Sequence, residues 1–377
     1  MEQRTGLLLS GGGARAAYQV GALLAIAKLW GRRPGNPFQI ICGTSAGAIN
    51  AVALACYGAR FRLGVRHLAR VWRNFHVDQV FEADTRAVLG SVGRWGSAIL
   101  FGALVRQNPL SLLNNAPLRA LLERELDFSA LAQALQAGDL RAVAVTASGY
   151  SSGENLAFYQ GAPDLEPWRR AQRVGVPSML AVDHLLASSA IPFVFPAVRI
   201  HREYFGDGSM RQMAPISPVI HLGAERILVI SGGRIQEKPR ARGEAYPSLA
   251  QVAGHALSSI FLDGLAMDLE RLQRINATLG AFSPEVRAQA GLTLKPIQTL
   301  VLAPSRSLDD LAAMHHRALP RALGFVLRSI GATRRNGSAL LSYLLFESVY
   351  TRALMDLGYR DALARTAELA SFLGLEA

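Results

Sequence analysis

The chain has 377 residues, of which 50% are hydrophobic and 18% are charged, and its formal net charge is +12 at pH 7. This composition excludes a disordered or collagen-like chain and suffices for a buried core. Cys42 and Cys56 are the only cysteines, too few for a disulfide framework or a metal site built from cysteines alone. We expect both to be buried as small apolar residues.

The positive charge is almost entirely arginine, because the only lysines are Lys28, Lys238 and Lys295. Arginine pairs bidentately with phosphates and carboxylates, so anionic lipid headgroups and nucleic acid are both admissible partners. The simpler alternative is an arginine bias spread over the whole surface. Residues 1–13 contain only three consecutive leucines before a glycine run, so we expect no signal peptide and a cytoplasmic location.

The N-terminal part predicts two strand–glycine–helix units. Residues 5–10 form a buried strand, followed by three glycines and a helix over 14–30. Residues 38–42 form a second strand, followed by a glycine-rich turn and a helix over 48–57. The uncharged run that holds this second unit is long enough for a membrane helix, but its polar turn favours strand, turn and helix. The alternation indicates an α/β fold with a mainly parallel sheet between layers of helices.

The following segment, residues 58–137, predicts a helical insertion. One helical stripe is apolar and the neighbouring stripe is cationic: Phe61, Val65, Leu68 and Trp72 beside Arg62, Arg66, Arg70 and Arg73. Within the insertion, residues 95–105 are uncharged and too short to span a bilayer, and whether they form a lid is left open. A Leu-rich helix follows a turn that begins at residue 114.

Beyond the insertion, short apolar runs predict strands over 142–147 and 155–159, a helix over 182–189 and a strand over 226–230, where the sheet is expected to end. The polar residues 236–247 predict a boundary. We therefore expect a catalytic domain over 5–235 and a mostly helical extension over 236–377 that packs on the core, although a strand-like run occurs at 297–302.

The sharpest chemical signal is Ser45 in the turn Gly43-Thr44-Ser45-Ala46-Gly47, between a predicted buried strand and a helix. A serine on so tight a turn projects from the carboxyl end of a sheet, and small neighbours permit the bend. The following helix points its N-terminal amides at the site, which favours developing negative charge.

The second signal is the run Gly11-Gly12-Gly13, followed by Ala14 and Arg15, also between a strand and a helix. Consecutive glycines let backbone N–H groups converge on an anion, either an oxyanion or a phosphate. The run fits a loose dinucleotide-binding pattern, but that fold requires a carboxylate at the end of the next strand. Since none stands near residue 42, dinucleotide binding is disfavoured.

A nucleophilic serine needs a base. Asp207 stands between Gly206 and Gly208 after an aromatic strand, which presents a carboxylate on a turn, although an ordinary Asp-Gly turn has the same pattern. None of the eight histidines lies in a motif that marks it as catalytic. A Ser–His–Asp triad would need a histidine after Asp207, and the chain offers His221, His255, His315 and His316.

Taken together, the glycine run, the serine turn and the Asp-Gly turn resemble the patatin-like phospholipase family in identity, order and spacing. The segment Ala187-Ser188-Ser189-Ala190-Ile191-Pro192-Phe193-Val194-Phe195-Pro196 also resembles a motif of that family. The resemblance covers about residues 5–235. It implies the patatin-like three-layer fold.

The resemblance also implies a Ser–Asp dyad, with Ser45 as nucleophile and Asp207 as general base. Gly11, Gly12 and Gly13 would supply the oxyanion hole, with Arg15, Gly43, Gly47 and Gly208 as supporting residues. Two positions depart from the family's pattern: Ser209 stands where glycine or alanine is usual, and Ala16 where the first motif has glycine.

The expected function is therefore hydrolysis of a lipid ester, namely a phospholipid, lysophospholipid or acylglycerol, with neither a metal nor a cofactor. The alternatives are a conventional triad esterase and a catalytically weak lipid-binding protein of the same fold. The arginine-rich helix over 62–73 would contact an anionic membrane surface peripherally. Nucleic acid is not expected, since no recognisable module accompanies the charge, and a homo-oligomer is left open.

Overall fold

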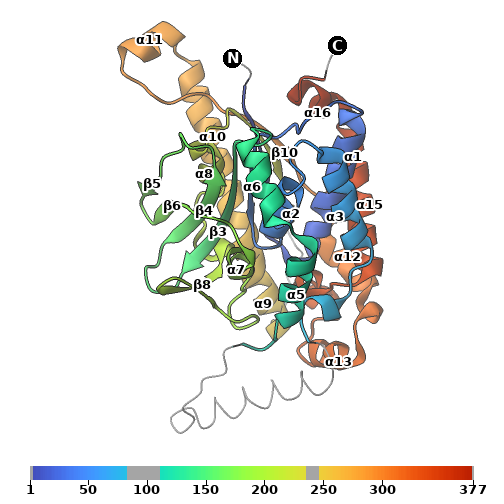
Figure 1. Ribbon diagram of the computed structural model, residues 1–377. Coiled ribbons are helices and arrows are strands. Elements are labelled where there is room, and N and C mark those ends of the chain that lie inside the picture. The colour runs from blue at the N-terminus through green and yellow to red at the C-terminus, as the bar shows by residue number, and fades with distance from the viewer. Residues whose placement is uncertain (1–2, 83–110, 235–245, 376–377) are drawn as a thin grey trace.

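The computed structural model describes residues 3–82, 111–234 and 246–375 (Figure 1). The uncharged segment 95–105 and most of the predicted boundary at 236–247 lie outside the described residues. A central sheet has helices on both faces, so the expected α/β class with a mostly parallel sheet is confirmed.

In the described part of the chain the sheet has ten strands, in the order β10-β9-β1-β2-β3-β4-β6-β5, with β8 also paired to β3 and β7 to β8. Strands β10, β9, β1, β2 and β3 run parallel to one another. β4 and β8 each pair antiparallel with β3. The strands are β1 Thr5–Leu9, β2 Ile40–Thr44, β3 Ala142–Gly149, β4 Asn155–Gly161, β5 Trp168–Arg170, β6 Arg173–Pro177, β7 Val198–Ile200, β8 Glu203–Asp207, β9 Arg226–Ile230 and β10 Gln298–Leu302.

The alternation of side chains along the strands divides the core into two. Leu7 and Leu9 of β1 pack into the larger cluster, which includes residues of α1 (Ala17–Trp30), α2 (Ala46–Ala55), α3 (Phe61–Arg73) and α15 (Ser348–Ala364). Leu8 packs into the smaller cluster with residues of α8 (Ser217–His221) and α10 (Gly264–Gly280). Both faces of the inner strands are apolar because both are covered, as expected for parallel strands. The buried cysteines Cys42 and Cys56 lie in these cores.

The described helices are α1 Ala17–Trp30, α2 Ala46–Ala55, α3 Phe61–Arg73, α5 Ala116–Glu125, α6 Phe128–Gln136, α7 Val182–Ser188, α8 Ser217–His221, α9 Leu249–Ser258, α10 Gly264–Gly280, α11 Pro284–Gln289, α12 Leu308–Met314, α13 Arg321–Ser329, α14 Ser338–Leu344, α15 Ser348–Ala364 and α16 Thr366–Phe372. The stripe predicted on α3 is correct: its four apolar residues are buried, whereas Arg66, Arg70 and Arg73 are exposed. Within the described ranges, we find no helix long and apolar enough for a bilayer crossing.

The part of the chain after residue 245 completes the core. Helix α15 packs along α1, and Leu341, Leu354 and Leu369 are fully buried. Strand β10 pairs in parallel with β9 along its whole length. The expectation that the sheet ends near residue 230 is therefore wrong, because a strand far away in sequence extends it at that edge.

Candidate active site

Ser45 occupies a sharp turn between β2 and α2. Its backbone has φ 56° and ψ −133°, a left-handed region that is costly for a residue with a side chain. The turn brings backbones into close contact, since a Cβ at Gly43 would lie 2.4 Å from the Gly47 carbonyl oxygen and one at Gly47 would lie 2.3 Å from that of Leu9. Both glycines therefore support the strained serine.

Asp207 ends β8 at the same edge of the sheet. β3 lies between them, because Thr146 pairs with Thr44 in β2 and the adjacent Ala147 pairs with Asp207. The end of α7 ties the two sites together: the Ser45 amide donates to Ser188 Oγ at 2.8 Å, and the Asp207 amide donates to the Ala190 carbonyl at 2.9 Å. The structure thus brings the serine and the carboxylate to one place.

The Asp207 carboxyl is almost completely buried, with 1% of its surface exposed. Burial raises its pKa to about 6, while the hydroxyl of Ser45 and the amide and hydroxyl of Ser209 act in the opposite direction. The Ser209 amide donates to Oδ1 at 2.9 Å, whereas Oδ2 has no fully aligned hydrogen bond within the described residues. A carboxylate with one oxygen left over is suited to accept a proton near neutral pH.

The glycine run lies beside this carboxylate. A Cβ on Gly11 would stand 2.7 Å from Ser209 Oγ, so the loop contacts the residue that holds Asp207. Gly13 has φ 54°, and a Cβ there would lie 2.4 Å from the Tyr343 carbonyl oxygen. Among the described residues, the amides of Gly11, Gly12 and Gly13 donate no hydrogen bond. These amides are available to an anion.

Arg15 has its guanidinium directed into the C-terminal helices. It is 3% exposed and pairs with Asp309, and it donates to Ser342 Oγ at 2.8 Å and to the Tyr343 hydroxyl at 2.9 Å. Its side chain also lies over the Tyr343 ring. These contacts fix the end of the glycine run to α14. Arg15 does not line the cavity described next.

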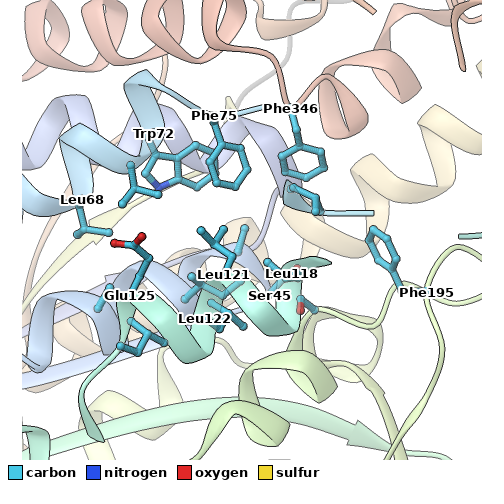
Figure 2. A pocket seen from close by; sticks show the side chains of 18 of the residues that line it. Ser45, Leu68, Trp72, Phe75, Leu118, Leu121, Leu122, Glu125, Phe195 and Phe346 are labelled. Atoms are coloured by element: carbon cyan, nitrogen blue, oxygen red, sulfur yellow. The ribbon is translucent and has the colours of Figure 1, made fainter. Parts of the chain in front are cut away.

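An apolar cavity opens from Ser45 between helices (Figure 2). Its wall consists mainly of aliphatic and aromatic side chains from α2, α3, α5 and the segments that follow α7 and α14. The lining residues are Gly13, Ser45, Ala46, Ile49, Ala53, His67, Leu68, Val71, Trp72, Phe75, Val80, Leu118, Leu121, Leu122, Glu125, Leu126, Ser189, Ile191, Phe195, Tyr343, Leu344 and Phe346.

None of the four histidines proposed for a triad lines this cavity. His221 stacks on Trp168 in a different hollow, and burial, with Arg170 and Arg173 nearby, lowers its pKa to about 4. His255 is exposed on α9. His67, which precedes Asp207 in the chain, does line the cavity, and it contacts Glu125.

Sequence reasoning missed a buried polar network behind the glycine loop. The Trp72 indole donates to Asn50 Oδ1 at 2.8 Å, Asn50 donates to Gln19 Oε1 at 3.0 Å, and Gln19 donates to the Ser10 carbonyl at 2.7 Å. A buried amide pair within helical sequence, Gln19 and Asn50, is the signal that was available, since such groups require partners. The network links the cavity wall to Ser10, the residue just before the glycine run.

We find no group of His, Cys, Asp and Glu side chains that could hold a metal ion in ranges 3–82, 111–234 and 246–375. The chemistry supported by the described site is that of a serine, a carboxylate and backbone amides at the carboxyl end of a parallel sheet. These features define an α/β protein with a serine-hydrolase type of site.

The chain belongs to the patatin-like phospholipase family, whose sequence profile matches residues 7–220. It is 28% identical over 210 residues to a cGAMP-activated phospholipase of Pseudomonas aeruginosa. The matched region covers 55% of this chain and 53% of that relative. The chain therefore spans about half the length of that curated relative.

Two solved structures resemble this chain at lower sequence identity. VipD from Legionella pneumophila is 13% identical with a TM-score of 0.32, and the match covers 94% of this chain and 67% of VipD. Human GIVD cytosolic phospholipase A2 is 12% identical with a TM-score of 0.37, and the match covers 99% of this chain and 63% of that one. At such scores neither likeness carries functional information.

Proposed function

We propose that this protein is a serine acyl hydrolase that cleaves carboxylic esters of lipids through a dyad of Ser45 and Asp207. The observation that carries the proposal is the strained Ser45, which lies beside a buried carboxylate, near free glycine amides and at the inner wall of an apolar cavity. Membership of the patatin-like phospholipase family supports a lipid ester as the substrate.

The reaction follows from these positions. Ser45 Oγ attacks the ester carbonyl carbon as its proton passes to Asp207, and the amides of Gly11, Gly12 and Gly13 stabilise the oxyanion. Collapse of the intermediate breaks the bond to the alcohol, which leaves with the proton from Asp207. Water then attacks the acyl-enzyme, again giving a proton to Asp207, and the fatty acid departs as Ser45 regains its hydrogen.

The direct test is hydrolysis of a p-nitrophenyl acyl ester by Ser45→Ala and Asp207→Asn. Each substitution removes one of the two reacting groups, so we expect turnover to fall by at least about 10³-fold in each while the fold is retained. His221→Ala and His315→Ala serve as controls for a conventional triad. Normal turnover in either dyad variant would contradict the proposal.

Peripheral contact with anionic lipid is a second part of the proposal, supported by the exposed arginines of α3. Arg66 and Arg73 carry charge on the outer surface of a helix whose inner face lines the cavity. Each basic residue near an anionic surface contributes about 1 kcal/mol, so Arg66→Glu with Arg73→Glu should weaken binding to phosphatidylglycerol vesicles by at least about tenfold. Sedimentation with vesicles measures this, with Arg274→Glu on the exposed side of α10 as the matched control.

A cytoplasmic location and a homo-oligomer remain proposals of the same kind. Fractionation of cells that express the intact protein tests the first, and light scattering of the purified protein tests the second.

A further inference from the structure

The cavity extends well beyond the reacting serine along one face of α2. Ser45, Ile49 and Ala53 follow one another at four-residue spacing and all line it. With a rise of 1.5 Å per residue, the path from Ser45 to Ala53 is about 12 Å long.

The facing wall is almost wholly apolar. Helices α3 and α5 each contribute one face, with the residues Leu68, Val71 and Trp72 from the first and Leu118, Leu121 and Leu122 from the second. The one polar atom of Trp72 is already satisfied by Asn50. A methylene chain along this path would therefore meet carbon on every side.

The far end of the path is polar. His67 and Glu125 line the cavity there, with Nε2 of the histidine 3.3 Å from Oε2 of the glutamate. Figure 2 shows Glu125 beside Leu68 on one side of the pocket, with Phe195 and Phe346 on the other. Arg70 lies 2.9 Å from His67 Nδ1, and since arginine only donates, Nδ1 of a neutral His67 is the acceptor and Nε2 carries the proton.

We propose that this cavity holds the acyl chain of the substrate and that the His67–Glu125 pair sets the longest chain it accepts, so that esters of medium-chain fatty acids are the preferred class. An extended chain advances about 1.2 Å per bond, so about 12 Å accommodates about ten carbons. The inference rests on the proposed function, since it assumes that Ser45 carries the acyl group.

The length of the acyl chain is limited because the cavity lining changes from apolar side chains to the polar His67–Glu125 pair. Each methylene that enters the apolar part contributes about fourfold to kcat/KM, whereas a methylene that reaches the pair would displace the solvation of a carboxylate. In a series of p-nitrophenyl esters we expect kcat/KM to rise about fourfold per carbon up to about decanoate and to stop rising, or fall, at longer chains.

Two variants should move this break in opposite directions. The double variant His67→Ala/Glu125→Ala removes both polar partners together and should move it to chains longer by several carbons. Ala53→Leu fills the far end of the path and should move the break to shorter chains. Arg274→Ala, exposed on α10 and outside the cavity lining, is the control and should leave the break in place. A break that stays at the same chain length in both variants would overturn the proposal.

Binding separates this proposal from the hydrolysis on which it rests. Calorimetry of octanoate, decanoate and hexadecanoate with Ser45→Ala should show affinity that rises up to about decanoate and no further, with the same shifts when the cavity variants are added. That break without ester hydrolysis in the native protein would uphold the chain site and contradict the proposed function. Ester hydrolysis by the native protein, together with an affinity that rises steadily through hexadecanoate, would uphold the proposed function and overturn the chain-length limit.

Discussion

Burial raises the pKa of the Asp207 carboxyl, which suits it to act as a base but lowers the stability of the fold at neutral pH. Its pKa is raised from 3.8 to about 6 in the folded protein, chiefly by burial. The folded state therefore binds a proton more tightly than the unfolded state, and the stability this provides is full below about pH 4 and is lost as pH rises through about 6. Ser45 is a second residue of the site that costs folding stability, because its backbone is strained.

The first residue-scale prediction concerns Asp207→Asn. Above pH 6 the substitution replaces a buried charge with a neutral group, so the variant should be more stable than the native protein by up to about 3 kcal/mol, with the difference vanishing toward pH 4. Urea unfolding across this pH range measures it. Native kcat/KM should fall about tenfold per pH unit below about 6. A native protein that is the more stable of the two at pH 8 would contradict this account of Asp207.

The second concerns Ser209, which replaces the glycine or alanine usual in the family. Its hydroxyl helps to lower the pKa of Asp207, so Ser209→Ala should move the midpoint of the pH–rate profile to higher pH while the plateau rate stays within a few-fold. Ser178→Ala, on the segment after β6, should leave the midpoint unchanged. A lower midpoint in Ser209→Ala would show that the hydroxyl does not stabilise the carboxylate.

Among the elements, those with local signals were predicted best. The serine turn, the glycine run and the apolar stripe of α3 each carry their pattern within a few residues. Strand β2 was placed two residues too early, because its pairing with β3 extends it through Thr44, and that pairing is not local. Likewise β10 joins the sheet only through β9, and the turn of π-helix at Ser259–Asp263 that presses Phe261 onto Gly11 has no signature in the sequence. Distant partners decided the extent of β2 and the place of β10.

An element-scale prediction follows from the contact between α1 and α15. A Cβ on Gly358 would lie 2.1 Å from the Tyr18 carbonyl oxygen, so the two helices approach too closely for a methyl group. Gly358→Ala should lower the free energy of unfolding by at least about 2 kcal/mol. Gly280→Ala in α10, where nothing lies within 4 Å, should be neutral or slightly stabilising. Thermal or denaturant unfolding of the pair measures the contrast, and equal stabilities would contradict the close packing.

For the molecule as a whole, the C-terminal helices are part of the site. The Arg15 network joins the glycine run to α12 and α14, and Tyr343 and Phe346 line the cavity. Residues 246–375 thus contribute side chains to the same core and to the same cavity as the residues before them. The sequence marked Arg15 as a supporting residue, but its partners could not be predicted because they lie about 300 residues further along the chain.

The corresponding prediction is that Asp309→Ala affects both stability and catalysis. It leaves the guanidinium of Arg15, which is 3% exposed, without its carboxylate, and it should cost about 2–4 kcal/mol in unfolding free energy. The glycine run should also lose its anchor, so kcat is expected to fall while KM changes less. Asp356→Ala, at an exposed acidic residue on α15, is the comparison. Unchanged kcat in a folded Asp309→Ala protein would show that the Arg15 network does not affect catalysis.

The measurement that tests the central claim most directly is labelling of the intact protein with a fluorophosphonate, followed by mapping of the modified residue. We predict a single adduct on Ser45, absent in Ser45→Ala and formed much more slowly in Asp207→Asn, because the probe reacts with an activated serine hydroxyl. An adduct on another residue, or an unmodified Ser45 in a preparation that hydrolyses lipid esters, would contradict the account.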